Sequence, residues 1–184
     1  MNFSLATHSE EETGALGERL GALLCGGSVV LLAGDLGAGK TRFAQGVARG
    51  LGVAVNVTSP TFNLVLEYPM EQRDGVSVPI WPLGQIGTLT PSLCSILRHF
   101  DLYRLDQADQ LNDLDYFGLI EQPDAVSLVE WGSKFASHLP LDYILVQLMV
   151  DEANPGSRLI ELSAEGSGSE AVLQRFALAE GLTI

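Results

Sequence analysis

Apolar positions recur at helical spacing in two early segments of the chain, on either side of a short apolar run. Residues 9–25 place four leucines on one helical face, and Ser9 with Glu12 forms a capping box at the start. Residues 28–33 (SVVLLA) form a β-branched and leucine run, which is typical of a strand buried on both faces. A second helix is predicted after a glycine-rich turn from apolar residues four apart: Phe43, Val47 and Leu51.

The rest of the chain continues this alternation of strands and helices. Five further segments predict strands: 62–68, 98–105, 125–131, 143–150 and 158–164. Helices are predicted at 107–120, with a turn, and at 168–180. Strands interleaved with helices predict an α/β fold with a mostly parallel central sheet.

Length and composition favour a single domain with its own core. Residues 1–184 are predicted to form one domain, since domains commonly hold about 100–200 residues. Residues 69–97 are rich in proline and glycine and predict an inserted loop, longer than connections normally are. With 46% hydrophobic residues the chain can bury a core without disulfides, and Cys25 and Cys94 fit a reducing cytosol.

Charge and hydropathy exclude some classes of protein. The acidic start, MNFSLATHSEEE, lacks the basic-then-apolar order of a signal peptide. The longest uncharged run, between Asp74 and Arg98, is interrupted by prolines and glycines and does not predict a membrane helix. We therefore expect a cytoplasmic protein with no membrane partner. A net charge of −13 disfavours direct, tight binding to nucleic acid.

The turn between the first strand and the second helix carries the clearest chemical signal. Glycines there allow successive backbone N–H groups to face phosphate oxygens, and the following helix directs its positive end at them. Lys40 adds a point charge, and the Thr41 hydroxyl can ligate Mg²⁺. The alternative, a glycine-rich turn with a solvent-facing lysine, is disfavoured by the strand before the turn and the helix after it. The eight residues satisfy the phosphate-binding pattern G-x-x-x-x-G-K-[ST]: Gly34, Asp35, Leu36, Gly37, Ala38, Gly39, Lys40 and Thr41.

A phosphate site of this kind needs a further carboxylate directed at Mg²⁺, at the end of a neighbouring strand. Glu130 follows an apolar run, and Asp101 in HFDLYRL is a second candidate. Each has an open alternative: Glu130 as an ordinary surface glutamate, and Asp101 as an ion-pair partner of Arg104. His99 is interpreted as a core or surface histidine rather than a catalyst.

Residues 58–65 (TSPTFNLV) predict a switch-like loop. They follow the helix after the phosphate-binding turn, where GTPase-like folds place a segment that senses the γ-phosphate. Without that position they would predict only a turn. Three hydroxyls flank Pro60: Thr58, Ser59 and Thr61.

Four sequence blocks, in order, strongly resemble the TsaE family of bacterial P-loop ATPases: GDLGAGKTRF, SPTFNLVLEY, HFDLYRL and LVEW. The resemblance covers roughly residues 3–165. It implies a P-loop NTPase-like three-layer fold, binding of ATP and Mg²⁺, weak intrinsic hydrolysis, and association with TsaD and TsaB. That family takes part in making threonylcarbamoyladenosine in tRNA, and this chain would meet tRNA only indirectly.

The resemblance also implies roles for individual residues. Thr41 and Glu130 would ligate Mg²⁺, directly or through water, and Asp101 would position water or metal near the γ-phosphate. Thr61 would belong to the switch-like loop. Trp131 would pack beside the site, and Arg158 would lie near the nucleotide. The loop around Lys40 would hold the phosphates: Asp35, Leu36, Gly37, Ala38, Gly39, Lys40, Thr41 and Arg42.

The chain departs from the family pattern at two points, the insertion at 69–97 and Ser133, where members often carry an acidic residue. Two other functions are weighed against an ATPase subunit of the tRNA-modifying machinery. A P-loop small-molecule kinase would commonly bring lid arginines onto the transferred phosphate, but the inserted loop holds only Arg73 before Arg98. The other is a nucleotide-dependent binding module without significant hydrolysis.

Overall fold

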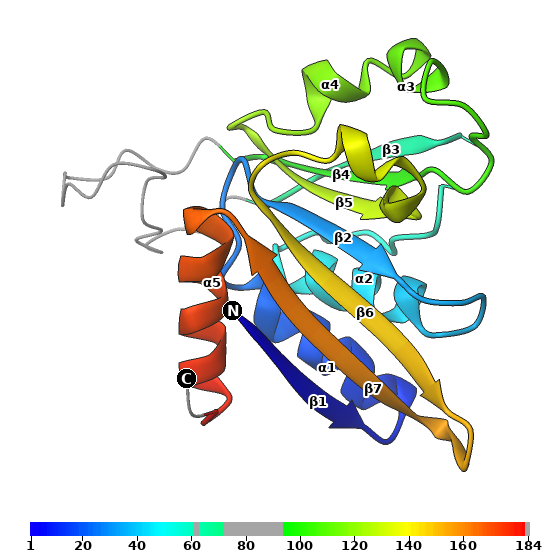
Figure 1. The fold of residues 1–184 in the computed structure, drawn as a ribbon. Coiled ribbons are helices and arrows are strands. Elements are labelled where there is room, and N and C mark those ends of the chain that lie inside the picture. Colours follow the sequence, from blue (N-terminus) through cyan, green and yellow to red (C-terminus); the bar gives the residue numbers. More distant parts are fainter. Residues whose placement is uncertain (61–62, 72–93, 183–184) are drawn as a thin grey trace, which may run out of the picture.

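The computed structural model describes residues 1–60, 63–71 and 94–182, which contain one seven-stranded sheet (Figure 1). The strands lie in the order β1-β7-β6-β2-β5-β4-β3. Their bounds are β1 Asn2–Thr7, β2 Val29–Ala33, β3 Val65–Pro69, β4 Ile96–Asp101, β5 Ala125–Glu130, β6 Tyr143–Asp151 and β7 Asn154–Glu165. The helices are α1 Glu10–Gly21, α2 Lys40–Gly50, α3 Gln110–Asp113, α4 Tyr116–Leu119, α5 Ser167–Ala179 and the 3-10 helix η1 Gly132–His138.

The centre of the sheet is parallel, as the α/β prediction requires. β6, β2, β5 and β4 run in the same direction as neighbours. The outer pairs, β1 with β7, β7 with β6 and β3 with β4, are antiparallel. The connection between β6 and β7 is a tight turn, too short for the crossover of a dozen or more residues that parallel strands need. The predicted class is therefore confirmed, with antiparallel additions at both edges.

Helices cover both faces of the sheet and give it the three predicted layers. α1, α2 and α5 share an apolar core with inward residues of the sheet such as Leu32, Leu128 and Leu162, and Figure 1 shows α1 and α2 behind the strands. On the other face, α3, α4 and η1 pack over a second apolar cluster that includes Leu31 and Val129. Adjacent residues of β2 and β5 thus bury opposite faces, which explains their continuous apolar runs.

The two helices nearest the phosphate-binding turn are packed backbone to backbone. A methyl group added at Gly17 of α1 would overlap the Phe43 carbonyl of α2, and one at Gly46 of α2 would overlap the Gly14 carbonyl of α1. Only glycine permits this approach. It brings the start of α1 beside the start of α2.

Several predicted elements have different bounds in the structure: α1 ends at Gly21 instead of residue 25, β3 begins at Val65 instead of residue 62, and β7 begins at Asn154 instead of residue 158. The predicted helix 107–120 is two short helices, α3 and α4, because Asp115 between them adopts a left-handed conformation with φ 51°. The predicted strand 98–105 ends at Asp101, where β4 gives way to a loop. Two elements were not predicted, β1 at the N-terminal edge and η1 after β5.

The predicted inserted loop, 69–97, is only partly described. Residues 72–93 lie outside the described residues, but both flanks belong to the sheet, since Pro69 ends β3 and Ile96 begins β4. Residues 69, 96 and 97 therefore belong to strands, and an inserted loop between the two strands stays a prediction.

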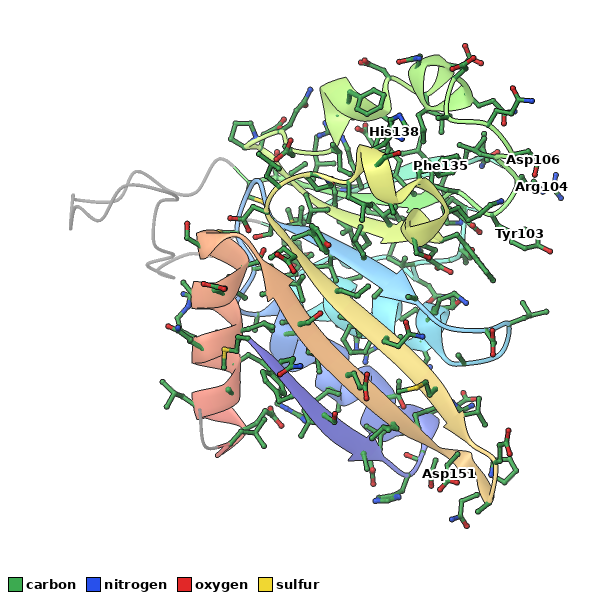
Figure 2. The ribbon with its side chains drawn as sticks, in the orientation of Figure 1. Tyr103, Arg104, Asp106, Phe135, His138 and Asp151 are labelled. Atoms are coloured by element: carbon green, nitrogen blue, oxygen red, sulfur yellow. The ribbon has the colours of Figure 1, made fainter. Side chains whose placement is uncertain are left out.

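Figure 2 shows the β6–β7 hairpin with Asp151 at its tip, where hydrogen bonds from the Asn154 side chain and the Ala153 N–H lower the pKa of this carboxyl.

Within the described part of the chain, we find no helix of the length and hydropathy that crossing a membrane requires.

Candidate functional site

The phosphate-binding turn joins β2 to α2, as predicted. Three of its residues adopt positive φ angles that side chains disfavour: Gly34 at 137°, Gly37 at 81° and Gly39 at 106°. Gly39 is the N-cap of α2 and offers no side chain, so the first N–H groups of this helix face the turn. An N-terminus of this kind attracts anions through its N–H groups and the helix dipole.

Four carbonyl oxygens of this turn accept hydrogen bonds from two cationic side chains. Lys40 Nζ donates to Gly34 O at 2.8 Å and to Asp35 O at 3.0 Å. Arg158 donates from Nε to Ala38 O at 2.8 Å and from Nη2 to Gly37 O at 3.3 Å. Because C=O and N–H point in opposite directions across a trans peptide, these bonds also fix the direction of the N–H groups that follow.

The ammonium of Lys40 lies under an aromatic ring. Its side chain is buried, and Nζ is 4.6 Å from the centroid of the Trp131 ring, within the range of a cation–π contact. Trp131 has a left-handed conformation, with φ 63°, and its ring packs on that of Tyr103 at 5.1 Å. The turn of the chain at Trp131 thus directs an aromatic side chain to the cation.

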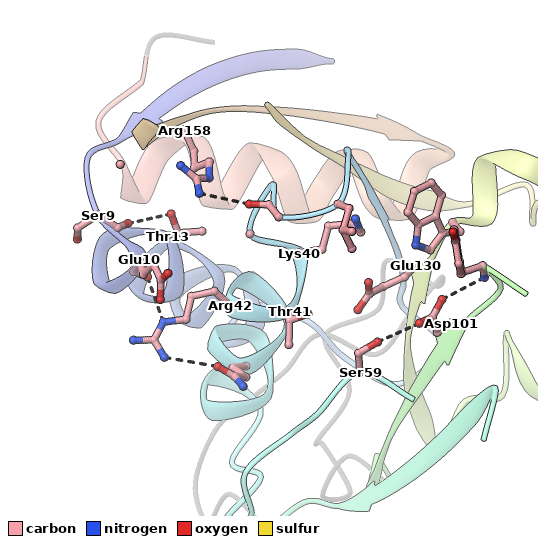
Figure 3. A pocket seen from close by; sticks show the side chains of 17 residues that line it. Ser9, Glu10, Thr13, Lys40, Thr41, Arg42, Ser59, Asp101, Glu130 and Arg158 are labelled. Carbon is pink, nitrogen blue, oxygen red and sulfur yellow. Dashed lines mark hydrogen bonds between the residues drawn. The ribbon is translucent and has the colours of Figure 1, made fainter. Parts of the chain in front are cut away.

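The two predicted carboxylates lie beside each other at the ends of neighbouring strands. In the parallel pair β4–β5, Asp101 is the register partner of Glu130, and on the other side of β5 Glu130 is paired with Leu32 just before the turn. Both residues are 3% exposed. Glu130 is therefore not the surface glutamate of the alternative interpretation, and the sheet brings both groups next to Lys40 (Figure 3).

Asp101 is held by hydrogen bonds to both of its oxygens. Oδ1 accepts from the Tyr103 N–H at 3.0 Å, and Oδ2 accepts from Ser59 Oγ at 2.9 Å. Ser59 belongs to the predicted switch-like segment, and Thr58 next to it exchanges hydrogen bonds with the Tyr68 hydroxyl through its backbone. Thr61 lies outside the described residues, so its predicted place in this segment stays a prediction.

His99 is completely buried, as expected for a core histidine, but it also contacts the site. Its Nε2 is 2.9 Å from Oε1 of Glu130. Within the described residues, Nδ1 of the same ring has no hydrogen-bond partner. Sequence reasoning set this residue aside, and the signal that could have found it is its place two residues before Asp101, on the same face of the strand.

These groups surround one cavity of about 650 Å³, a size typical of small-ligand sites. Asp35 and Ala38 contribute backbone to the turn but do not line the cavity. The other predicted residues that the structure describes do line it: Leu36, Gly37, Gly39, Lys40, Thr41, Arg42, Asp101, Glu130, Trp131 and Arg158. Several unpredicted residues join them: Ser9, Glu10, Thr13, Gln45, Tyr103 and Gly156.

Arg42 is directed to α1 rather than to the turn. Its guanidinium donates to the Glu10 carbonyl at 3.3 Å and lies 3.5 Å from the Glu11 carboxylate. Figure 3 shows Arg42 and Glu10 together on one side of the cavity, and Asp101 and Glu130 on the other. The close packing of α1 on α2 therefore brings Arg42 and Glu10 to this side of the cavity.

The donors of the cavity suit a nucleotide with Mg²⁺. Helix-terminal N–H groups and Lys40 match phosphate oxygens, and the hydroxyl and carboxylate oxygens of Thr41, Glu130 and Asp101 match a hard cation. Among the described residues, no three His, Cys, Asp or Glu side chains form a metal-binding group. Mg²⁺ is commonly held by one or two carboxylates together with substrate phosphates.

Comparisons with known proteins agree on one family. A sequence model described as "Threonylcarbamoyl adenosine biosynthesis protein TsaE" matches residues 7–160. The chain is 39% identical over 142 residues to "tRNA threonylcarbamoyladenosine biosynthesis protein TsaE" of Mycobacterium tuberculosis, covering 75% of this chain and 73% of the relative. The protein of the same name from Bacillus subtilis is 33% identical over 169 residues, covering 91% and 89%.

The fold is similar to a solved structure as well. The crystal structure of Bacillus subtilis YdiB matches with a TM-score of 0.63 and 27% identity, over 98% of this chain and 97% of that one. The similarity therefore extends over the whole sheet and its helices, including the edges outside the family match.

Proposed function

The chain belongs to the TsaE family and takes part in the biosynthesis of threonylcarbamoyladenosine in tRNA, and we propose that it does so by binding and hydrolysing ATP with Mg²⁺. The single observation that carries this proposal is the register pair of Asp101 and Glu130, buried beside Lys40 in the cavity at the phosphate-binding turn.

The polar groups around the phosphate-binding turn have separate tasks in this reaction. The N–H groups of the turn and the ammonium of Lys40 bind the phosphates and neutralise charge that develops on them. Arg158 supports this binding indirectly: its guanidinium donates to carbonyl oxygens of the turn and so holds the turn in place. Thr41 and Glu130 hold Mg²⁺, directly or through water, and this ion supplies charge neutralisation at the phosphates.

Asp101 orients the attacking water. Hydrogen bonds from Ser59 and from the Tyr103 backbone, one to each oxygen, fix the plane of the carboxylate. A carboxylate with a fixed plane positions a water molecule better than a freely rotating one, because it loses less rotational entropy when the transition state is reached. Ser59 also joins the switch-like segment to this group, so occupation of the γ-phosphate position can alter that segment.

Homologues of TsaD and TsaB are the proposed partners, and tRNA is reached only through them. The chain carries a net charge of −13, which opposes direct contact with tRNA phosphates. Nucleotide-dependent order in the switch-like segment would change a docking surface, and docking would in turn change nucleotide affinity, since such coupling is reciprocal.

The test is release of phosphate from ATP by the purified chain, with and without TsaD and TsaB homologues. We expect slow release by the chain by itself and faster release in the complex. A nucleotide-dependent binding module would bind ATP but release no phosphate in either case. A small-molecule kinase would instead transfer phosphate to an acceptor. Complex formation measured in ATP, in ADP and without nucleotide should differ among the three states.

A further inference from the structure

His99 is a fully buried titratable side chain that the proposed hydrolysis does not use. It lies on β4 and points to the same face of the sheet as Leu97 and Asp101, toward the core under α1 and α2. Its Nε2 atom is 2.9 Å from Oε1 of Glu130, and the two side chains are 0% and 4% exposed.

The contact crosses two parallel strands diagonally. The register partner of His99 on β5 is Leu128, and Glu130 lies two residues further along the same face. The Glu130 side chain therefore meets the imidazole with one oxygen while it also lines the cavity. An oxygen held by His99 leaves the other oxygen of the carboxylate for a ligand in the cavity.

The hydrogen bonding of the ring points to a task at Glu130. A carboxylate is an acceptor, so Nε2 carries the hydrogen and donates it. Nδ1 has no partner among the described residues, which makes the imidazole a costly way to fill space in an apolar core. A leucine would fill a purely structural position without that cost, so the bond to Glu130 is what the histidine adds.

We infer that His99 is a positioning residue, which fixes the orientation of the Glu130 carboxylate toward Mg²⁺. The inference rests on the proposed function, because it assigns Glu130 to the metal. Hydrogen-bonded partners of metal ligands hold the ligand in place, and their loss commonly weakens metal affinity or activity about 10- to 100-fold.

The experiment measures binding of ADP and ATP by calorimetry over a series of Mg²⁺ concentrations and in EDTA. We expect the His99→Leu variant to need at least about 10-fold more Mg²⁺ for the metal-dependent gain in nucleotide affinity. Its affinity in EDTA should equal that of the unmodified chain, since the phosphate-binding turn is untouched. His99→Gln should keep most of the Mg²⁺ response, because its amide N–H can donate to the same oxygen.

A matched control separates positioning from loss of stability. Ser127 is equally buried on β5, and its hydroxyl donates to the Ile120 carbonyl at 2.8 Å, away from the cavity. Ser127→Ala should lower the melting temperature without changing the Mg²⁺ response. If His99→Leu does not fold, His99→Asn takes its place, since asparagine is too short to reach Glu130 and should lose the Mg²⁺ response that glutamine keeps.

A combined variant tests whether His99 acts through Glu130. Adding His99→Leu, or His99→Asn, to Glu130→Gln should cause no further loss of Mg²⁺ response, because the two residues then act as one unit. An unchanged Mg²⁺ response in the folded His99 variants, or fully additive losses in the combined variant, would overturn the inference. Failure of the unmodified chain to bind any nucleotide would instead refute the proposed function.

Discussion

Ser59 Oγ donates a hydrogen bond of 2.9 Å to Oδ2 of Asp101, which ties the segment after α2 to the end of β4. The two residues are separated by 42 positions in the sequence and meet at the wall of one cavity. The bond links a candidate switch to the carboxylate proposed to orient water.

Ser59→Ala should therefore slow hydrolysis more than it weakens ATP binding. Loss of a hydrogen bond to a charged group commonly costs about 1.5–3 kcal/mol, so we expect the rate of phosphate release in the presence of partners to fall about 10-fold or more. Thr58→Ala is the matched control, since Thr58 exchanges hydrogen bonds with the Tyr68 hydroxyl through its backbone. Equal rates of phosphate release from the two variants would contradict a role for Ser59 in hydrolysis.

Lys40→Ala should abolish productive ATP binding and leave the fold intact. The ammonium that it removes is directed at the phosphate-binding turn, and charge-assisted contacts to phosphate are among the strong hydrogen bonds. Calorimetric titration with ADP and a circular dichroism melt measure the two effects. The other lysine, Lys134, donates to the Tyr103 and Leu105 carbonyls, and Lys134→Ala should keep nucleotide affinity. Unchanged affinity in the Lys40 variant contradicts the phosphate site.

Asp101→Asn and Glu130→Gln should act on hydrolysis more than on binding. Both substitutions keep shape and remove charge from groups that the proposal places at the attacking water and the metal. We expect turnover to fall about 10-fold or more in each, with most of the ATP affinity retained at saturating Mg²⁺. Single-turnover rates and ATP titrations separate the two effects. Normal hydrolysis by both variants in the presence of partners would make these carboxylates structural.

Tyr116 predicts how stability depends on alkaline pH. Burial in the core under α3 and α4 raises the pKa of its phenol, with a further contribution from the charge of Glu121. The unfolded chain releases this proton near pH 10, while the folded chain retains it, so the free energy of unfolding falls as pH rises above about 10. The slope is about 1.4 kcal/mol per pH unit for one proton. Urea unfolding between pH 8 and 11 should show a shallower decline in Tyr116→Phe; identical slopes would contradict the prediction.

The sequence predicts the phosphate-binding turn well because its chemistry is local. Glycine spacing, the lysine and the flanking apolar run are all contained in one short segment, so no long-range contact is needed to recognise them. That Asp101 and Glu130 lie side by side could also be predicted, since the ends of parallel strands share one edge of a sheet. The antiparallel pairing of β7 could have been inferred from the short gap between the segments at 143–150 and 158–164.

Contacts that depend on strand register and on helix packing could not be predicted from the sequence pattern. The bond between His99 and Glu130 follows from a diagonal across two strands, which periodicity within one strand does not specify. Ser9, Glu10 and Thr13 reach the cavity only because glycines let α1 approach α2 closely. β1 alternates polar and apolar residues over only four positions, 2–5, shortly before a helix.

The bonds from Lys40 and Arg158 to four carbonyls of the turn have a thermodynamic consequence. A loop already ordered before a ligand arrives has little conformational entropy left to lose, so association is not delayed by a folding step. The diphosphate portion, common to ATP and ADP, then binds with a similar entropy change in both. Under the proposed function, we expect a difference between the two nucleotides to arise where Ser59 meets Asp101, in the ordering of the segment after α2, rather than in the affinity of the turn for the diphosphate.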